Sequence, residues 1–147
     1  MAKVIMKECN SYSLDEVTLA LNEGMAHLGG WDRFLKPGMI VLLKVNPITP
    51  RGPESAAITH PEFVRAITRI LKAKGCIVWI GDSSGGAIAG TAPTARAFKA
   101  SGLEDMAISE GALIKNFDVE GVQSVVVDNP FISKMHLAKP VFEADLV

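Results

Sequence analysis

The sequence predicts an α/β fold, a Rossmann-like three-layer arrangement around a mostly parallel sheet. Residues 39–45 and 76–80 have the near-uniform hydrophobicity of strands that are buried on both faces. Between them, residues 61–73 form an amphipathic stretch that begins with a proline and is followed by lysines and Gly75, as a helix would be. The order strand, helix, strand is typical of the crossover units that build parallel sheets.

The flanking segments supply the other expected elements. Residues 3–9 alternate like an opening strand, and a helix follows from the S-x-x-E capping box of Ser13 and Glu16 to the glycine pair at 29–30. We expect two short helices within residues 93–111, separated at Ser101 and Gly102, and strands at 112–117 and 122–128. Residues 140–147 resemble the start of another apolar strand, so the sheet is expected to be truncated at the C-terminus.

Length and composition limit the classes of protein that need consideration. The 147 residues suit one domain, 1–147, which we interpret as the N-terminal portion of a longer domain. Hydrophobic residues make up 48% of the chain and the net charge is −1, so we expect neither nucleic-acid binding nor attraction to an anionic membrane. There is no bilayer-spanning apolar run and no signal peptide, so a cytoplasmic location is expected.

The two cysteines, Cys9 and Cys76, lie far apart in apolar stretches. They lack the close spacing of a zinc or iron–sulfur motif, and we expect both to be buried, reduced thiols. The sequence thus predicts no metal site and no iron–sulfur cluster within this chain.

Polar residues follow the predicted strands at their carboxyl ends, where ligands bind in open parallel sheets. We expect these residues to line one crevice: Lys44 and Asn46 after one strand, Thr59 and His60 at the start of the next helix, and Asp82, Ser83, Ser84, Gly85 and Gly86 after the following strand. Lys44 would supply positive charge, and the glycine amides would orient an anion. Asp82, His60 and Lys44 are the candidates for a catalytic role.

Each candidate also has a structural interpretation. Lys44 fits a lysine that extends its ammonium from a strand end into water, and Asn46 precedes a proline as a turn former does. His60 before Pro61 suits a helix cap, and Asp82 suits an acceptor for loop amides. His27 and His136 are interpreted as structural.

The segment Gly81-Asp-Ser-Ser-Gly-Gly86 matches no common catalytic or nucleotide-binding motif. It lacks the G-x-x-x-x-G-K-[ST] frame of a P-loop and the G-x-G-x-x-G spacing of a dinucleotide fold. A nucleophilic serine needs an elbow such as G-x-S-x-G with a base in reach, which Ser83 and Ser84 match only superficially. A phosphate-contacting or loop-stabilising role is favoured for these serines.

Four segments in this order, VLLKVN, THPEFVRAITRILKAKG, VWIGDSSGG and VFEADLV, resemble the N-terminal portion of the domain of unknown function 362 family. That family typically reads Lys-Pro-Asn where this chain has Lys44, Val45 and Asn46, and Gly-Asp-Ser-x-Gly-Gly at 81–86. Its usual continuation, a strand ending in Pro-Lys-x-Lys-Thr-His, does not occur here. Many relatives carry ferredoxin-type cysteine clusters outside this region, and the family's activity is not established.

Three hypotheses follow. The first is a binding domain for an anionic small molecule or cofactor in a redox-associated, iron–sulfur-linked protein. The second is a non-catalytic scaffold or docking module, whose partners would be the remainder of a full-length protein or a second copy joined through the severed edge. The third, more remote, is a serine hydrolase using Ser83 or Ser84. Whether the domain is an enzyme stays open.

Overall fold

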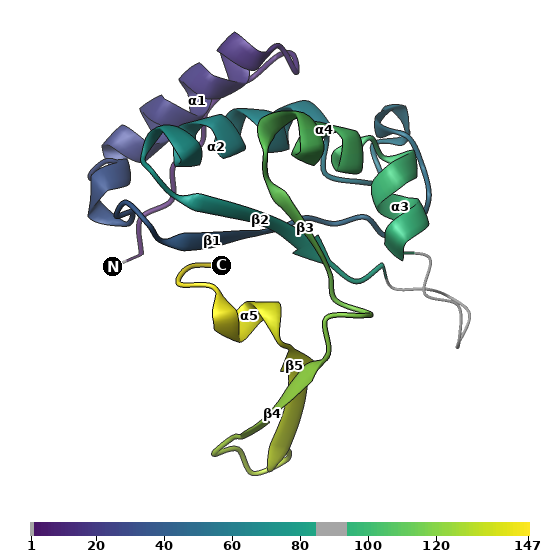
Figure 1. The fold of residues 1–147 in the computed structure, drawn as a ribbon. Coiled ribbons are helices and arrows are strands. Elements are labelled where there is room, and N and C mark those ends of the chain that lie inside the picture. Colours follow the sequence, from purple (N-terminus) through teal and green to yellow (C-terminus); the bar gives the residue numbers. More distant parts are fainter. Residues whose placement is uncertain (1, 85–93) are drawn as a thin grey trace.

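The computed structural model describes residues 2–84 and 94–147 and has the α/β architecture that the sequence predicts (Figure 1). Its central sheet contains β1 (Ile40–Lys44), β2 (Ile77–Asp82) and β3 (Leu113–Asn116) in that spatial order. Both pairings are parallel, and the register sets Lys44 beside Gly81 and Asp82 beside Asn116. The carboxyl ends of the strands therefore meet at one edge, as expected.

Helices cover one face of this sheet. α1 (Leu14–His27), α2 (Pro61–Ala73) and α4 (Leu103–Glu110) lie on the same side, while α3 (Thr94–Ala100) stands near the carboxyl ends of the strands (Figure 1). Single 3₁₀ turns, Trp31–Arg33 and Pro53–Ser55, interrupt two of the loops. The core between sheet and helices is apolar and includes Val41, Val64, Leu71, Val78, Ile80, Phe98, Leu103 and Met106.

The helix starts follow from their caps. Ser13 caps α1 by accepting a hydrogen bond from the Glu16 amide at 3.3 Å, as predicted. The second hydrogen bond of a capping box, from the Ser13 amide to the Glu16 carboxylate, does not form. That carboxylate instead accepts from the Asn10 amide and the Ser11 hydroxyl. Pro61 occupies the first turn of α2, and Gly102 adopts the left-handed conformation between α3 and α4.

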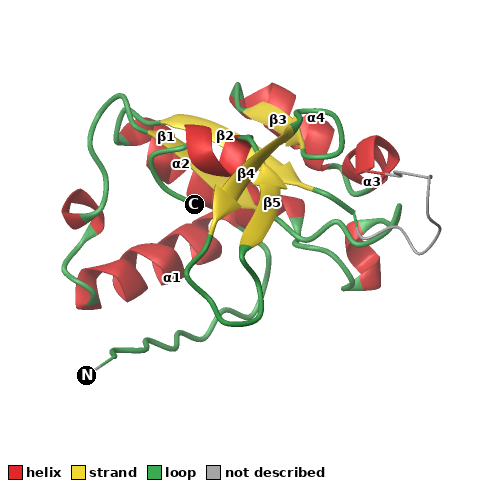
Figure 2. Cartoon of the chain, turned by 90° about the horizontal axis from the view of Figure 1, so that it is seen from below, coloured by secondary structure: helices red, strands yellow, loops and turns green. Residues whose placement is uncertain are grey.

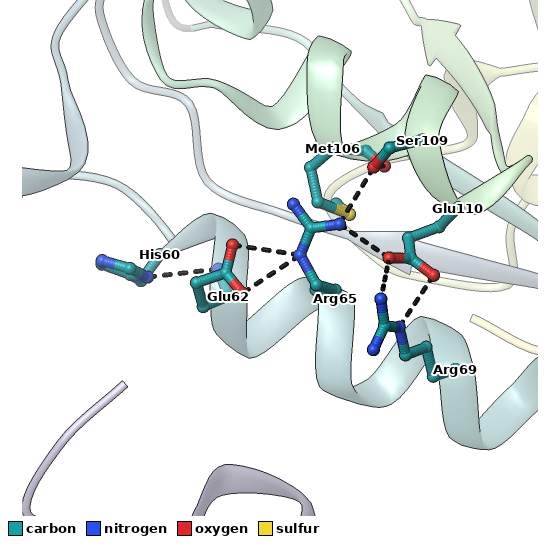
Figure 3. A network of polar contacts seen from close by, with 7 residues as sticks. All are labelled: His60, Glu62, Arg65, Arg69, Met106, Ser109 and Glu110. Carbon is teal, nitrogen blue, oxygen red and sulfur yellow. Dashed lines mark hydrogen bonds and ion pairs between the residues drawn. The ribbon is translucent and has the colours of Figure 1, made fainter. Parts of the chain in front are cut away.

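A polar network joins α2 to α4 (Figure 3). Arg65 and Arg69 extend from α2 toward Glu110 at the end of α4, with Nη1 of Arg65 and Nη2 of Arg69 both donating to Oε1 of Glu110, at 2.6 and 2.8 Å. Glu62 accepts from Nε of Arg65 at 3.0 Å. The network therefore helps to fix the packing of α2 against α4.

The expected strand at the N-terminus is absent. Residues 3–9 run as an extended arm outside the sheet, without a ladder partner among the described residues, and Figure 2 shows this arm as loop. Val4 and Met6 are 82% and 91% exposed. Cys9 on this arm is exposed, so the prediction that it is buried is wrong, whereas Cys76 is buried as expected. Alternation alone does not supply a strand with a partner.

The C-terminal part also departs from the prediction. β4 (Val122–Val126) and β5 (Lys134–Ala138) form a separate antiparallel hairpin. Residues 140–147 begin as a short helix, α5 (Pro140–Glu143), on the face opposite α2 (Figure 1). Leu146 pairs with the sheet through a parallel bridge to Val41, and Asp145 exchanges hydrogen bonds with the Ile40 backbone at the start of β1. Pro140 favours a helical first turn, which explains why the predicted strand is reduced to this bridge.

Candidate functional site

The central feature at the carboxyl edge of the sheet is an ion pair between Lys44 and Asp82. Nζ of Lys44, at the end of β1, lies 3.0 Å from Oδ2 of Asp82, at the end of β2. The Asp82 side chain is only 6% exposed, whereas the Lys44 side chain is 54% exposed. A buried carboxylate therefore holds an ammonium group that faces solvent. This confirms the predicted proximity of the two residues.

The partners of this pair define what each group can do. Oδ1 of Asp82 accepts from the Ser83 amide at 2.8 Å, so both carboxylate oxygens are engaged. Nζ of Lys44 also approaches the Val45 carbonyl oxygen at 3.5 Å. An ammonium has three donors, and this arrangement leaves one for a ligand. The geometry thus leaves the Asp82 carboxylate fully engaged and the Lys44 ammonium with one donor facing solvent.

Asn46 and Thr59 extend the site along the next loop. The Asn46 amide donates to Oγ1 of Thr59 at 3.1 Å, which brings the segment after β1 against the residues that precede α2. The Lys44–Asp82 pair and the Asn46–Thr59 hydrogen bond are thus joined through the backbone from Lys44 to Asn46. The predicted convergence of these two sets of residues is present.

His60 caps α2, as its structural interpretation expected. Its Nδ1 accepts from the Glu62 amide at 3.2 Å, an arrangement that leaves Nε2 as the donor nitrogen of the ring (Figure 3). The ring also stacks on Tyr12, with centroids 3.7 Å apart and planes within 8° of parallel. Nε2–H is the donor that remains for another molecule.

A cavity of about 470 Å³ adjoins this stack. Its walls are Tyr12, Pro53, Glu54, Ala56, Ile58 and His60. Ala56 has φ 53° and ψ 13°, a left-handed conformation that is uncommon for a residue with a side chain. Such local strain occurs more often at functional loops than elsewhere, which is consistent with a binding role for this one.

The hydrogen bonds of Ser84 do not involve the Lys44–Asp82 pair. Its amide and hydroxyl both contact Oγ1 of Thr94, at 2.8 and 2.9 Å, and both residues are buried. Neither Ser83 nor Ser84 has a hydrogen bond from its hydroxyl to a histidine or carboxylate within the described part of the chain. Gly85 and Gly86 lie outside the described residues. The serine-hydrolase hypothesis therefore gains no support from this geometry.

Sequence reasoning missed several residues at this edge. Tyr12 comes from the loop before α1 and Thr94 begins α3, and nothing local marks either residue as part of the site. Asn116 was open to prediction, because it ends β3 and so obeys the same strand-end rule as Lys44 and Asp82. Its Oδ1 accepts from the Asp118 amide at 3.0 Å, which stabilises the following turn.

The chain's own cysteines do not fit an iron–sulfur cluster. Such a cluster is held by about four thiolates, whereas this sequence contains only Cys9 and Cys76. Cys76 lies with Sγ 3.7 Å from the Lys36 carbonyl oxygen, and burial raises the pKa of its thiol. Across residues 2–84 and 94–147, no three His, Cys, Asp or Glu side chains gather as a metal-binding group.

The described helices contain no segment with the length and apolarity needed to cross a membrane.

Comparison with known proteins places this architecture in a family. Over 80 residues the chain is 35% identical to the thylakoid-associated protein sll1697 of Synechocystis, an alignment that covers 54% of this chain and 25% of that relative. The match thus spans about a quarter of the relative's length. No solved structure is significantly similar. The model of the domain of unknown function DUF362 matches residues 41–147, which include β1, β2 and the Lys44–Asp82 pair, and the chain therefore belongs to the DUF362 family.

Proposed function

We propose that the carboxyl edge of the sheet binds an anionic small molecule or cofactor, and that the domain serves this role in a redox-associated protein. The observation that carries the proposal is the Lys44–Asp82 pair, in which a buried carboxylate holds a half-exposed ammonium at 3.0 Å. A lysine fixed in this way presents its remaining donor in a set direction. Fixing the donor before binding lowers the entropic cost of binding an anion.

The neighbouring groups support the same class of ligand. The side chain of Asn46 and the Nε2–H of His60 supply neutral donors along the loop that Thr59 ties to β1. The adjoining cavity of about 470 Å³ has the size of ordinary small-molecule sites. Glu54 is the one carboxylate residue among those that line it, which favours a ligand whose anionic end lies outside this cavity and whose remainder carries hydroxyl or amino groups.

The test is thermal unfolding of the full chain with inorganic phosphate, ATP or NADH as the added ligand. We expect at least one of the three to raise the melting temperature in a saturable manner. Lys44→Met should abolish that increase. The matched control is Lys74→Met, which removes a surface lysine paired with Asp32 at 2.7 Å before β2, at the opposite end of the strand. The proposal fails if none of the three stabilises the chain, or if both variants respond alike.

A docking role is the second candidate, and the β4–β5 hairpin favours it. Phe131 at its tip is 92% exposed, and Val126 and Ile132 nearby are also exposed. An isolated two-stranded hairpin is marginally stable in water, so a second copy of this chain packed on it would stabilise it. This candidate predicts self-association in sedimentation that Phe131→Ser weakens and Lys44→Met leaves unchanged. A chain that stays monomeric at high concentration would eliminate it.

A further inference from the structure

A second cavity, of about 540 Å³, lies between the N-terminal arm and α1, away from the edge that carries Lys44. One wall is the arm, from Ile5 to Tyr12, and the other is α1 with Phe63 of α2. Its size falls within the range of sites that hold small organic ligands. None of the predicted site residues lines it, although Tyr12 lines both this cavity and the one beside His60.

The helix wall is apolar and long. Val17, Leu21, Met25 and Leu28 all face the cavity, and the stretch from Val17 to Leu28 spans about 16 Å at the rise of an α-helix. An elongated apolar wall fits a linear hydrocarbon chain better than a compact ring. Burying such a chain here would gain about 25 cal/mol for each Å² of apolar surface removed from water.

Gly24 in the middle of this wall is informative. A glycine inside a helix costs about 1 kcal/mol relative to alanine. A Cβ at Gly24 would meet only Cγ of Lys7, at 3.9 Å, so the surrounding structure does not require a glycine. Because Gly24 has no side chain, the cavity keeps room for a ligand against the helix backbone.

The charges on the walls indicate one end of the ligand. Lys7 is the one residue with a formal charge among those that line the cavity, and no carboxylate does so. Asn10, Ser11 and Tyr12 add neutral hydrogen-bonding groups. Glu23, which pairs with Lys7 from outside the cavity, is on the solvent side, and such exposed pairs contribute little free energy. A ligand carboxylate can therefore replace Glu23 as the partner of Lys7.

We propose that this cavity binds a single-chain carboxylate amphiphile of the fatty-acid type, with its hydrocarbon chain along α1 and its carboxylate at Lys7. The N-terminal arm then covers the hydrocarbon chain of the bound ligand. Asn10 and Ser11 tie one end of the arm to Glu16 of α1, whereas the Lys7–Glu23 pair and the bond from Lys3 to the His27 carbonyl oxygen are exposed and can exchange for ligand contacts.

The test is titration of the full chain with dodecanoate, followed by calorimetry and by methyl NMR of Met25. We expect saturable binding of one molecule, with shifts at Met25 in the wild-type chain. Gly24→Leu should fill the cavity and weaken binding at least tenfold. Ala26→Leu introduces the same side chain at an exposed position of α1 that does not line the cavity, so its affinity should stay within twofold. No saturable binding, or equal affinity in both variants, overturns the proposal.

Two further measurements separate the parts of the proposal. Lys7→Met should weaken dodecanoate binding at least threefold while leaving the binding of dodecan-1-ol unchanged, and an equal loss for both would overturn the assignment of the carboxylate. Lys44→Met should leave dodecanoate binding unchanged, because the anion site lies elsewhere. If Gly24→Leu does not fold by circular dichroism, Ala20→Leu at the same wall replaces it with the same expected loss.

Discussion

Arg69 and Glu110 form a two-bond ion pair that joins α2 to α4. Nε of Arg69 donates to Oε2 of Glu110 at 2.9 Å, and Nη2 donates to Oε1 at 2.8 Å. Arg65 donates to the same Oε1, and the Glu110 side chain is only 11% exposed. The hydrogen bond from Arg69 is the largest cause that lowers the pKa of the Glu110 carboxyl to about 2; burial opposes it, and the hydrogen bond from Arg65 and the charges of both arginines add to the lowering. This carboxylate therefore couples stability to pH.

The coupling predicts acid sensitivity in a defined window. Because the pKa of Glu110 is lower in the folded chain, its contribution is complete above the ordinary value of 4.5 and is lost as the pH falls toward 2. The shift from 4.5 to about 2 corresponds to a contribution on the order of 3 kcal/mol at neutral pH. Glu110→Gln should remove most of it. Urea unfolding at pH 7, 4 and 2 should show wild-type and variant stabilities converging with acid, and a constant difference would contradict this.

Gly81 is expected to tolerate no side chain. A Cβ at Gly81 would lie 2.7 Å from Cε1 of Phe117, 2.9 Å from Cδ1 of Leu42 and 3.0 Å from the Lys115 carbonyl oxygen. Because one of these neighbours is backbone, Gly81→Ala should lower the free energy of unfolding by about 1–3 kcal/mol. Gly24→Ala, in a helix with open space around it, should instead raise that free energy by up to about 1 kcal/mol. Denaturant midpoints of the two variants should move in opposite directions, and a shift in the same direction would count against this account.

The ion pair at the sheet edge should contribute to stability as well as to binding. Lys44→Met leaves the buried Asp82 carboxylate without its ammonium partner, which costs about 1–3 kcal/mol for a buried polar group. Lys44→Arg restores the charge and should recover most of that stability. Thermal unfolding of the two variants without ligand checks this expectation. Equal stability of wild type and Lys44→Met would show that the pair serves binding alone.

The parts of the fold that the sequence predicted are those set by local pattern. The apolar runs that became β1 and β2 placed Lys44 and Asp82 at the same strand ends, because parallel strands share their direction. The arm at residues 3–9 has equally strand-like alternation. It remains unpaired in the described chain because strand formation also needs pairing with a distant segment, which no local pattern specifies.

Other parts of the site depend on contacts between distant segments. Tyr12 contacts His60 across 48 positions of the sequence, and Thr94 contacts Ser84 across ten. Neither contact has a spacing that a single sequence can reveal. The left-handed Ala56 is similarly hidden, because alanine is not a residue that usually marks such a turn. The residues at the strand ends are thus predictable from this sequence, whereas the contacts made by the loop residues near them are not.

The two roles available to His60 can be separated by substitution. His60→Ala removes the cap of α2 and should lower the free energy of unfolding by about 1 kcal/mol. His60→Asn keeps a capping acceptor and should retain the stability of the wild type, but it removes the Nε2–H donor and the stacked ring next to Tyr12. If the proposed site is correct, both variants weaken binding of the phosphate or nucleotide that stabilises the wild type. Unfolding curves measured with and without that ligand provide both quantities. Wild-type affinity in His60→Asn would restrict His60 to its capping role and place the ligand nearer to Lys44.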